Sequence, residues 1–385
     1  MKISKSDINI ILGLPLSMRG PSYTCARLAE AMKGPATDVT IHAPLSIRTV
    51  DVNVKVESFR ITDRTRILHA VQLALGDMFR QRNENRVLRL LERNADRPIV
   101  YTFGEVSLET SRRLRAMGAF VVREKFNIGK LRGREIIDAA YAPFGVRPLF
   151  DIADAEIDKE YEEMMLADAI FSPSPMVAQS LAGIGVPEGR IIATSYGWEP
   201  TRFNIAPRSE RNDKPTFLFV GFICVAKGAH ILLEAWERAK LDGRLVLVGR
   251  IEPVIRDRFG HILARDDVEV VPFTPDPGKC YREADWFVFP SLAEGGPQVT
   301  YEAGAHGLPG LVSPMGAGAF LRHGKEGHIV DSTDPGQWAE ALTLAAASRQ
   351  DAKCLSIAAR ERARLFTWET VGIQRREALL KAADA

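Results

Sequence analysis

Short apolar runs alternate with longer amphipathic stretches along the whole chain. The runs lie at 8–12, 39–42, 99–103, 120–123, 169–172 and 191–193, and again at 216–220, 245–249, 268–271, 286–290 and 311–313. Runs of this length, closed by glycine, proline or polar residues, are typical of strands buried in a parallel sheet. Helical spacing of apolar residues appears at 22–32, 62–94, 161–166, 229–240, 298–306, 337–347 and 351–382. The alternation predicts an α/β fold.

Length and charge narrow the class of protein. A chain of 385 residues is too long for one ordinary core and suits two domains. With 46% hydrophobic and 26% charged residues, it has the composition of a globular protein. A net charge of +2 excludes a strong attraction of the whole protein to nucleic acid.

The cysteines and the hydropathy bear on location. The four cysteines lie far apart without a C-x-x-C pair, at Cys25, Cys224, Cys280 and Cys354. This argues against a disulfide framework and a cysteine zinc site, and favours a reduced, cytoplasmic setting. No apolar run approaches the roughly 20 residues that span a bilayer. The lysines before the first apolar run do not form a secretion signal, because Asp7 interrupts them and no small-residue cleavage site follows.

Residues 285–314 predict a ligand-binding loop. The strand at 286–290 is followed by Gly295, Gly296 and Pro297, then by a helix at 298–306 and a strand at 311–313. Pro297 suits a first helical position. The loop therefore opens at the carboxyl end of a parallel strand, where open α/β sheets bind ligands. Free N–H groups around Gly295 to Gln298 favour a phosphate there.

Glu294 and Glu302 flank that helix start, with seven residues between them. A carboxylate would repel a phosphate, so we expect both side chains to accept hydrogen bonds from hydroxyl groups. A ligand that offers phosphates and hydroxyls together is a nucleotide sugar. By themselves, however, two glutamates at this spacing are better explained as a solvated loop residue and an exposed helix position.

The surrounding motif resembles the E-x7-E signature of the retaining glycosyltransferases of family four, which have the B-type fold. It reads Pro290, Ser291, Glu294, Gly295, Glu302, Ala303, Gly307 and Pro309. The family usually has an aromatic residue and a glycine where this chain has Gly296 and Pro297. The resemblance implies two Rossmann-like domains facing across a cleft, at 1–197 on the acceptor side and 198–366 on the donor side. A C-terminal helix at 367–385 would return to the first domain.

The resemblance also implies a donor site. The segment from Gly221 to Gly228 is similar to the family's G-x5-K-G, whose lysine, here Lys227, binds donor phosphates. Phe222 replaces the arginine that the family commonly has, and Arg250 is the nearest substitute. Glu294 and Lys227 are the expected catalytic residues. The expected donor-binding residues are Gly20, Gly221, Lys227, Arg250, Phe273, Gly295, Gly296, Pro297, Gln298 and Glu302. Gly20 can also be interpreted as a turn residue only, and Arg250 as an ordinary loop arginine.

A polar set follows the strand at 120–123. Arg123, Glu124 and Asn127 fall at the carboxyl end of that strand and are candidates for acceptor binding, although a solvated loop fits equally well. The acceptor is expected to be a glycan, a lipid-linked sugar or a small molecule. We expect no cofactor and no metal, because lysine and a helix start meet the donor's charge and no D-x-D motif is present.

The predicted function is retaining, metal-independent glycosyl transfer from a nucleoside-diphosphate sugar. Two alternatives stay open: a nucleotide-sugar epimerase on the same fold, and a non-catalytic sugar-nucleotide or partner-binding protein. Residues 60–97 carry nine arginines against five acidic side chains. Such a basic amphipathic tract can contact anionic lipid at the inner membrane surface, whereas a solvated helix face is the commoner explanation.

Overall fold

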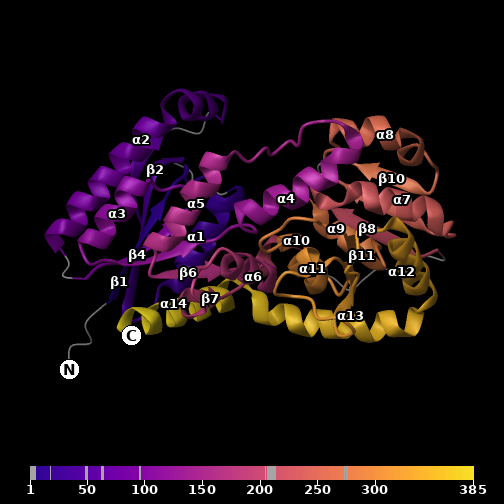
Figure 1. Cartoon of the computed structure of the whole chain (residues 1–385). Helices are drawn as coiled ribbons and strands as arrows, with labels where there is room; N and C mark the ends of the chain where they lie inside the picture. Colours follow the sequence, from indigo (N-terminus) through magenta and orange to yellow (C-terminus); the bar gives the residue numbers. More distant parts are fainter. Residues whose placement is uncertain are drawn as a thin grey trace.

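Two parallel β-sheets flanked by helices form two lobes that lie side by side (Figure 1). The computed structural model describes residues 6–385 except 18, 48–50, 62–64, 95–96, 204, 206–213, 273 and 275. Within these residues, the first sheet has the strand order β3-β2-β1-β4-β5-β6-β7 and the second β10-β9-β8-β11-β12-β13. The expected α/β class with two Rossmann-like domains is confirmed.

The first lobe is built from residues up to about the end of β7. Its strands are β1 (Ser6–Leu12), β2 (Thr37–Ile47), β3 (Lys55–Ile61), β4 (Ile99–Phe103), β5 (Phe120–Glu124), β6 (Ala169–Ser172) and β7 (Ile191–Ala193). Its helices are α1 (Gly20–Met32), α2 (Thr65–Asn94), α3 (Leu108–Ala116), α4 (Lys130–Tyr141), α5 (Asp154–Leu166) and α6 (Pro175–Gly183). Short 3-10 turns lie at η1 (Ala142–Phe144) and η2 (Glu188–Arg190).

The second lobe begins with β8. Its strands are β8 (Thr216–Val220), β9 (Arg244–Val248), β10 (Val268–Val271), β11 (Trp286–Phe289), β12 (Gly310–Val312) and β13 (Gly327–Ile329). Its helices are α7 (Ala229–Ala239), α8 (Pro253–Leu263), α9 (Pro277–Glu283), α10 (Gln298–Ala305), α11 (Pro314–Ala317), α12 (Pro335–Ala347) and α13 (Arg349–Ala363). The 3-10 turns are η3 (Pro200–Arg202), η4 (Val225–Lys227) and η5 (Arg364–Phe366).

Strand β2 is longer than the predicted run at 39–42, because the chain stays in the sheet beyond Pro44. The pairing of β2 with β3 shifts register between His42 and Leu45. Such an irregularity accommodates a proline, which cannot donate a ladder hydrogen bond. Strand β3 lies at the sheet edge and reads KVESFRI, so it lacks the continuous apolar run by which the central strands are predicted.

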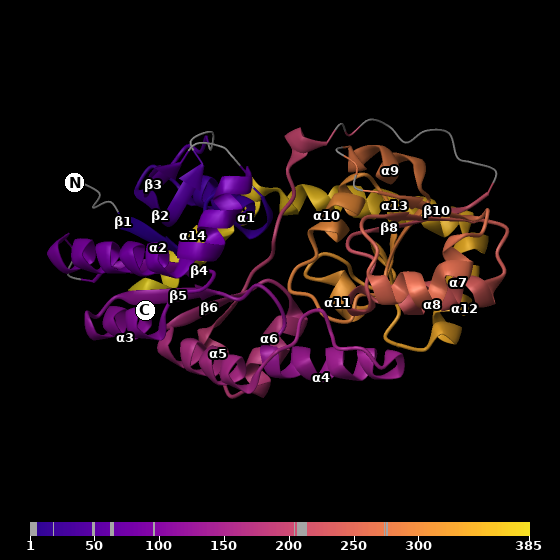
Figure 2. The same cartoon turned by 90° about the horizontal axis from the view of Figure 1, so that it is seen from above.

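The C-terminal helix returns to the first lobe, as expected. Helix α13 runs along the second lobe, and α14 (Trp368–Asp384) runs along the first and packs against α1 (Figures 1 and 2). The outgoing and returning chain segments lie side by side. The Trp198 N–H donates to the Phe366 carbonyl at 3.0 Å, and the Trp198 indole Nε1 donates to the Ala363 carbonyl at 2.7 Å.

A glycine permits the close packing of α14 on α1. A Cβ atom on Gly372 would lie 2.3 Å from the Cβ of Ala31. We therefore expect Gly372→Ala to lower the free energy of unfolding by about 1–3 kcal/mol through overpacking. Urea denaturation measures this change. Gly183→Ala in α6 is the control, since no atom lies within 4 Å of the added Cβ; it should be neutral or stabilising, and an equal loss in both variants would contradict the packing argument.

Two histidines, His42 (buried) and His230 (half-buried), predict acid sensitivity. Burial lowers the pKa of His42 on β2 and of His230 on α7 to about 4. An unfolded chain binds these protons near pH 6.5, so the free energy of unfolding rises with pH between about 4 and 6.5. For His230 alone, we expect the free energy of unfolding to be roughly 2 kcal/mol lower at pH 5 than at pH 7. The difference between wild type and His230→Gln, followed by urea denaturation at both pH values, isolates this contribution; equal pH slopes would refute it.

Candidate active site

Lys227 and Glu294 form an ion pair at the carboxyl ends of β8 and β11. The ammonium of Lys227 contacts Glu294 Oε1 and donates to the Ala293 carbonyl at 3.2 Å. Ser291 also donates to Glu294 Oε1, at 3.2 Å. The Lys227 side chain is 26% exposed and that of Glu294 13% exposed. The structure thus brings the two expected catalytic residues together. Each lies in the segment that follows a different strand, and the lysine stays accessible to solvent.

Gly228 explains how this pair is held. Its φ is +70°, and a Cβ atom there would lie 2.0 Å from the Pro290 carbonyl oxygen. Only glycine therefore allows η4 to lie directly against the loop that carries Glu294. The glycine that follows Lys227 in the sequence motif is required by this contact, independently of any ligand.

Glu302 has separate surroundings from Glu294. It lies on α10 and is buried, and its Oε2 accepts a hydrogen bond from the Tyr281 hydroxyl at 3.0 Å. Burial raises the pKa of the Glu302 carboxyl above its usual range, while the charge of Arg202 and the Tyr281 hydrogen bond oppose that shift. Tyr281 in turn stacks on His306. Glu302, the second glutamate of the motif, is thus oriented by the Tyr281 hydroxyl, and it does not occupy an exposed helix position.

The start of α10 faces the first lobe. The loop after β5 pairs with it through a bridge between Asn127 and Gly295, and the Ile128 N–H donates to the Glu294 carbonyl at 3.2 Å. A Cβ on Gly295 would lie 1.7 Å from the Phe126 carbonyl oxygen. Gln298 donates from Nε2 to Thr24 Oγ1 of α1 at 2.9 Å.

Gly296 and Pro297 complete this contact region. A Cβ on Gly296 would lie 2.8 Å from the Tyr196 ring, and Pro297 is the N-cap residue of α10 and not its first helical residue. The expected phosphate-binding segment therefore lies between the lobes, with the backbone at 126–128 immediately in front of it.

A cavity of about 560 Å³ lies between the lobes next to the Lys227–Glu294 pair. Lys227, Ala293 and Phe222 line it from the second lobe. The acceptor candidates Arg123, Glu124 and Asn127 line it from the first lobe. Helix α4 and η1 reach across to the second lobe beside it, where the Tyr141 hydroxyl donates to Glu252 Oε1 at 2.7 Å (Figure 2).

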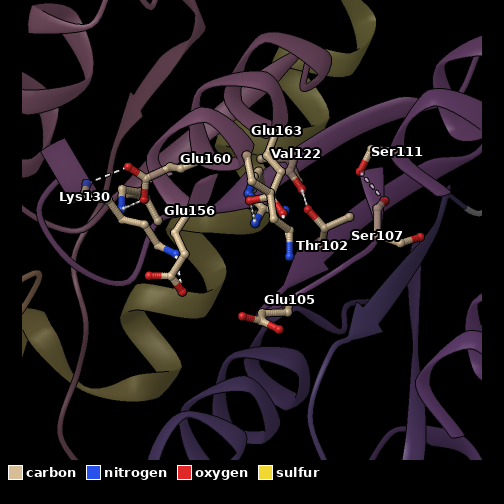
Figure 3. A network of polar contacts seen from close by, with 12 residues as sticks. Thr102, Glu105, Ser107, Ser111, Val122, Lys130, Glu156, Glu160 and Glu163 are labelled. Atoms are coloured by element: carbon tan, nitrogen blue, oxygen red, sulfur yellow. Dashed lines mark hydrogen bonds and ion pairs between the residues drawn. The ribbon is translucent and has the colours of Figure 1, made fainter. Parts of the chain in front are cut away.

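Ion pairs between β5 and α5 line the first-lobe side of the cavity. Arg123 Nη2 contacts Glu163 Oε2 at 2.5 Å, and Lys125 Nζ contacts Glu160 Oε1 at 2.7 Å. Figure 3 shows Glu156, Glu160 and Glu163 near one another, and the backbone N–H of Lys130 donates to Glu160 Oε2 at 2.6 Å. Burial raises the pKa of the Glu163 carboxyl, opposed by the charge of Arg123. Burial lowers the pKa of Lys125, opposed by Glu160.

Sequence reasoning missed Lys125, Glu160 and Glu163. Arg123 and Lys125 are two residues apart and so share one face where β5 ends. Glu156, Glu160 and Glu163 are spaced four and three residues apart, which places them on one face of a helix. This spacing was a usable signal, but the predicted helix began only at 161, so two of the three carboxylates lay outside it.

The carboxylate of Glu124 is not free, because it pairs with other side chains of the protein. Its side chain is fully buried and contacts Arg375 of α14 at 2.6 Å, and the Tyr101 hydroxyl donates to it as well. Although Glu124 belongs to the cavity wall, this pairing makes it an anchor for α14. A solvated loop, the alternative interpretation of this set, is wrong for Arg123 and Glu124, because both are buried.

The remaining donor candidates are dispersed. Gly20 is the first residue of α1 with φ +52° and open space around its Cβ position. Gly221 follows β8 with φ +144°, and its N–H donates to the Val248 carbonyl at 2.9 Å. The Arg250 guanidinium lies 5.6 Å from the centre of the Phe222 ring. Arg250 is therefore next to the position where the family commonly has the arginine for which it is the expected substitute. Phe273 lies outside the described residues.

Helix α2 makes up most of the basic tract at 60–97. Of its described arginines, Arg80 contacts Asp77 and Glu105, and Arg86 contacts Glu57. These ion pairs reduce the charge available for a lipid surface, and contact with a membrane stays a prediction. Among the described helices, none has both the length and the apolar character needed to cross a bilayer. Among the described residues, no group of three or more His, Cys, Asp or Glu side chains is placed to hold a metal ion.

Comparisons with known proteins place this geometry in context. Residues 214–347 match the family model described as "Glycosyl transferases group 1". The D-inositol 3-phosphate glycosyltransferase of Thermobispora bispora is 27% identical over 250 residues, which are 58% of this chain and 58% of that protein. The amylovoran biosynthesis glycosyltransferase AmsK of Erwinia amylovora is 26% identical over 53% of this chain and 54% of its own length. The chain thus spans a little over half the length of these relatives.

Similarity to solved structures covers 98% of the chain, beyond the segment that matches the family model. A glycosyltransferase of Rickettsia africae superposes with a TM-score of 0.69 at 16% identity, covering 98% of both chains. Anabaena HepE, solved in complex with UDP and glucose, superposes with a TM-score of 0.64 at 13% identity, covering 98% of this chain and 100% of HepE. These likenesses show the GT-B fold. Residues 214–347 are thus similar to the group 1 glycosyltransferases, and the chain as a whole has the GT-B fold.

Proposed function

We propose that the protein transfers a glycosyl group from a nucleoside-diphosphate sugar to an acceptor hydroxyl, with retention of configuration and without a metal ion. The observation that carries this proposal is the Lys227–Glu294 pair, which lies at the edge of the interlobe cavity. Both residues belong to the segment that matches the group 1 glycosyltransferases. HepE was solved with UDP and with UDP-glucose, which supports a diphosphate sugar as the donor.

The reaction needs negative charge to be stabilised on the leaving group. The bond between the anomeric carbon and the diphosphate oxygen breaks, and its electron pair leaves with the diphosphate. The acceptor oxygen forms the new bond on the same face, and its proton passes to the departing phosphate oxygen. The transferred sugar is cationic and oxocarbenium-like during this step. The protein therefore has to place a positive charge at the diphosphate and a negative charge near the ring.

Lys227 and Glu294 suit these two tasks. On donor binding, the accessible Lys227 ammonium exchanges its carboxylate partner for the diphosphate, as a flexible point charge can. Glu294 is then released to accept hydrogen bonds from the transferred sugar, and its charge favours the cationic ring. The amides from Gly295 to Gln298 add donors for the phosphate. Because the backbone at 126–128 covers them, we propose that the donor enters when the lobes separate.

Glu302 is proposed to hold the ribose hydroxyls. Its carboxylate is oriented by the Tyr281 hydroxyl, which bonds to one oxygen. A carboxylate held in one orientation can accept two adjacent hydroxyl groups without losing further side-chain entropy. The acceptor, whether a glycan, a lipid-linked sugar or a small molecule, would approach from Arg123 and Asn127 in the first lobe. No nucleic acid is part of this scheme.

A thermal-shift screen of nucleoside diphosphates and their sugars tests donor binding. A ligand at about 100 times its Kd stabilises the folded state by about 2.7 kcal/mol, so the matching nucleotide should raise Tm by several degrees. The shift should be lost in Lys227→Ala and kept in Lys353→Ala, which alters an exposed lysine of α13. It should also persist in EDTA. No shift with any nucleotide, or equal shifts in both variants, would count against the proposal.

A further inference from the structure

The interlobe cavity has one charged wall and one apolar wall. The charged wall consists mainly of the side chains at the end of β5 and on α5 described above, with Glu105, Lys130 and Lys227 beside them. The apolar wall contains Phe126, Ile137, Phe150, Ile152 and Phe222. A ligand that fills the cavity therefore meets polar groups on one side and hydrocarbon on the other.

The charged wall carries no excess of either sign. Five cationic side chains line the cavity, Arg123, Lys125, Lys130, Lys159 and Lys227, and so do five carboxylates, Glu105, Glu124, Glu156, Glu160 and Glu163. Each of the five cations has a carboxylate partner among the described residues. The Arg123 and Lys125 pairs are buried, so a phosphate could recruit these cations only by displacing a buried carboxylate. The cavity wall thus gives no electrostatic preference for a phosphorylated acceptor.

Two polar atoms of this wall make no hydrogen bond. They are Arg123 Nε and Glu163 Oε1, which are buried, although the two groups are joined through Nη2 and Oε2 and Lys159 Nζ lies 3.9 Å from Glu163 Oε1. Buried polar atoms nearly always make hydrogen bonds, so a donor and an acceptor without one in the same cavity wall point to a ligand group. A hydroxyl donates and accepts at once, and it therefore complements both atoms.

The apolar wall continues onto the surface. Phe150 lines the cavity and is 65% exposed, and Val146 and Leu149 on the same segment are 45% and 50% exposed. This segment connects η1 to α5. A run of exposed apolar side chains leading out of a cavity is typical of a surface that binds a ligand's apolar part.

We propose that the acceptor is an uncharged glycoside with an apolar aglycone. Its sugar hydroxyls bond to Arg123 Nε and Glu163 Oε1, and its aglycone lies along Ile152 and Phe150 toward the surface. The proposal rests on the proposed function, because it names the acceptor class of the same site. It selects among the glycan, lipid-linked and small-molecule acceptors that the sequence leaves open.

The test is a binding titration of the full chain by tryptophan fluorescence, with and without saturating UDP. The probes are n-octyl β-D-glucopyranoside, -galactopyranoside and -mannopyranoside below their critical micelle concentrations, each beside its free sugar and its sugar 6-phosphate. At least one octyl glycoside should bind about tenfold or more tightly than both counterparts, because the octyl chain buries apolar area. If the sugar phosphates bind most tightly, or if no octyl glycoside binds, the inference is overturned.

Matched variants separate specific from detergent-like binding. Phe150→Ser should weaken octyl glycoside binding about fivefold or more and leave the free sugar unchanged, since only the apolar contact is lost. Leu344→Ser, which alters an equally exposed apolar residue of α12 at 68%, should change nothing. Glu163→Gln should weaken glycoside and free sugar alike. Equal effects of Phe150→Ser and Leu344→Ser would overturn the inference. Because the glycosides are also titrated without UDP, their ranking decides this inference even if the nucleotide fails to bind, which would contradict the proposed function alone.

Discussion

Replacing Lys227 by alanine is expected to lower kcat/KM for glycosyl transfer by about 10²–10³-fold, the loss typical of removing one group that stabilises transition-state charge. The lysine is the ammonium that contacts Glu294 next to the cavity, and the family match covers it. Without it, the proposed stabilisation of the departing diphosphate would rest mainly on the backbone amides. Initial rates of nucleoside diphosphate release, measured with a responsive donor and acceptor, give this ratio.

Two controls accompany the Lys227 measurement. Lys353→Ala removes an exposed lysine of α13 and should leave kcat/KM unchanged. Urea denaturation of Lys227→Ala should show a loss below about 1 kcal/mol, because a partly exposed ion pair contributes little to stability. Transfer within twofold of wild type in a folded Lys227→Ala protein would contradict the assigned role and favour a non-catalytic binding protein.

The largest expected effect on stability comes from Arg375→Met, which should lower the free energy of unfolding by about 3–5 kcal/mol. The Arg375 guanidinium is 1% exposed and bonds to both oxygens of Glu124, at 2.6 and 3.3 Å. It also donates to the Ser195 carbonyl at 2.8 Å and packs on the ring of Phe171. Its removal leaves the Glu124 carboxylate buried without its counter-ion. Urea denaturation measures the loss.

Neighbouring changes separate the buried pair from general damage to α14. Arg376→Met alters the next residue, whose guanidinium donates to the Lys33 carbonyl at 3.1 Å at an exposed site, and it should cost less than about 1 kcal/mol. The double variant Glu124→Gln with Arg375→Met should be more stable than Arg375→Met alone, since no unpaired charge remains. A loss below 1 kcal/mol in Arg375→Met would show that the pair does not anchor the returning helix.

The second lobe could be predicted because its strands have clear sequence patterns. The strand at 216–220 is buried on both faces and therefore reads as a continuous apolar run. The turn at Lys227 and the loop at Glu294 follow such strands directly, so their meeting at one sheet edge follows from parallel topology. The less regular edge strand β3 and the helices of the first lobe give weaker local signals, and α4 was not predicted.

Long-range partners could not be predicted from local patterns. Glu124 and Arg375 are 251 positions apart in the sequence, and nothing in either segment indicates the other. The contact of Gly295 with the Phe126 carbonyl depends on how the two lobes meet, which no single strand or helix determines. Glycine at that position is compatible with a phosphate site and with this backbone contact, so the motif alone does not separate the two.

The central claim is transfer of a sugar from a nucleoside diphosphate to an acceptor hydroxyl, and proton NMR of the anomeric region tests it most directly. The protein is incubated with the nucleotide sugar that raises its Tm, first alone and then with the octyl glycosides. The account predicts an unchanged donor in the first sample, and in the second a new anomeric signal with the donor's configuration together with free nucleoside diphosphate. An altered sugar in the acceptor-free sample would identify an epimerase, and a new signal of opposite configuration would contradict retention.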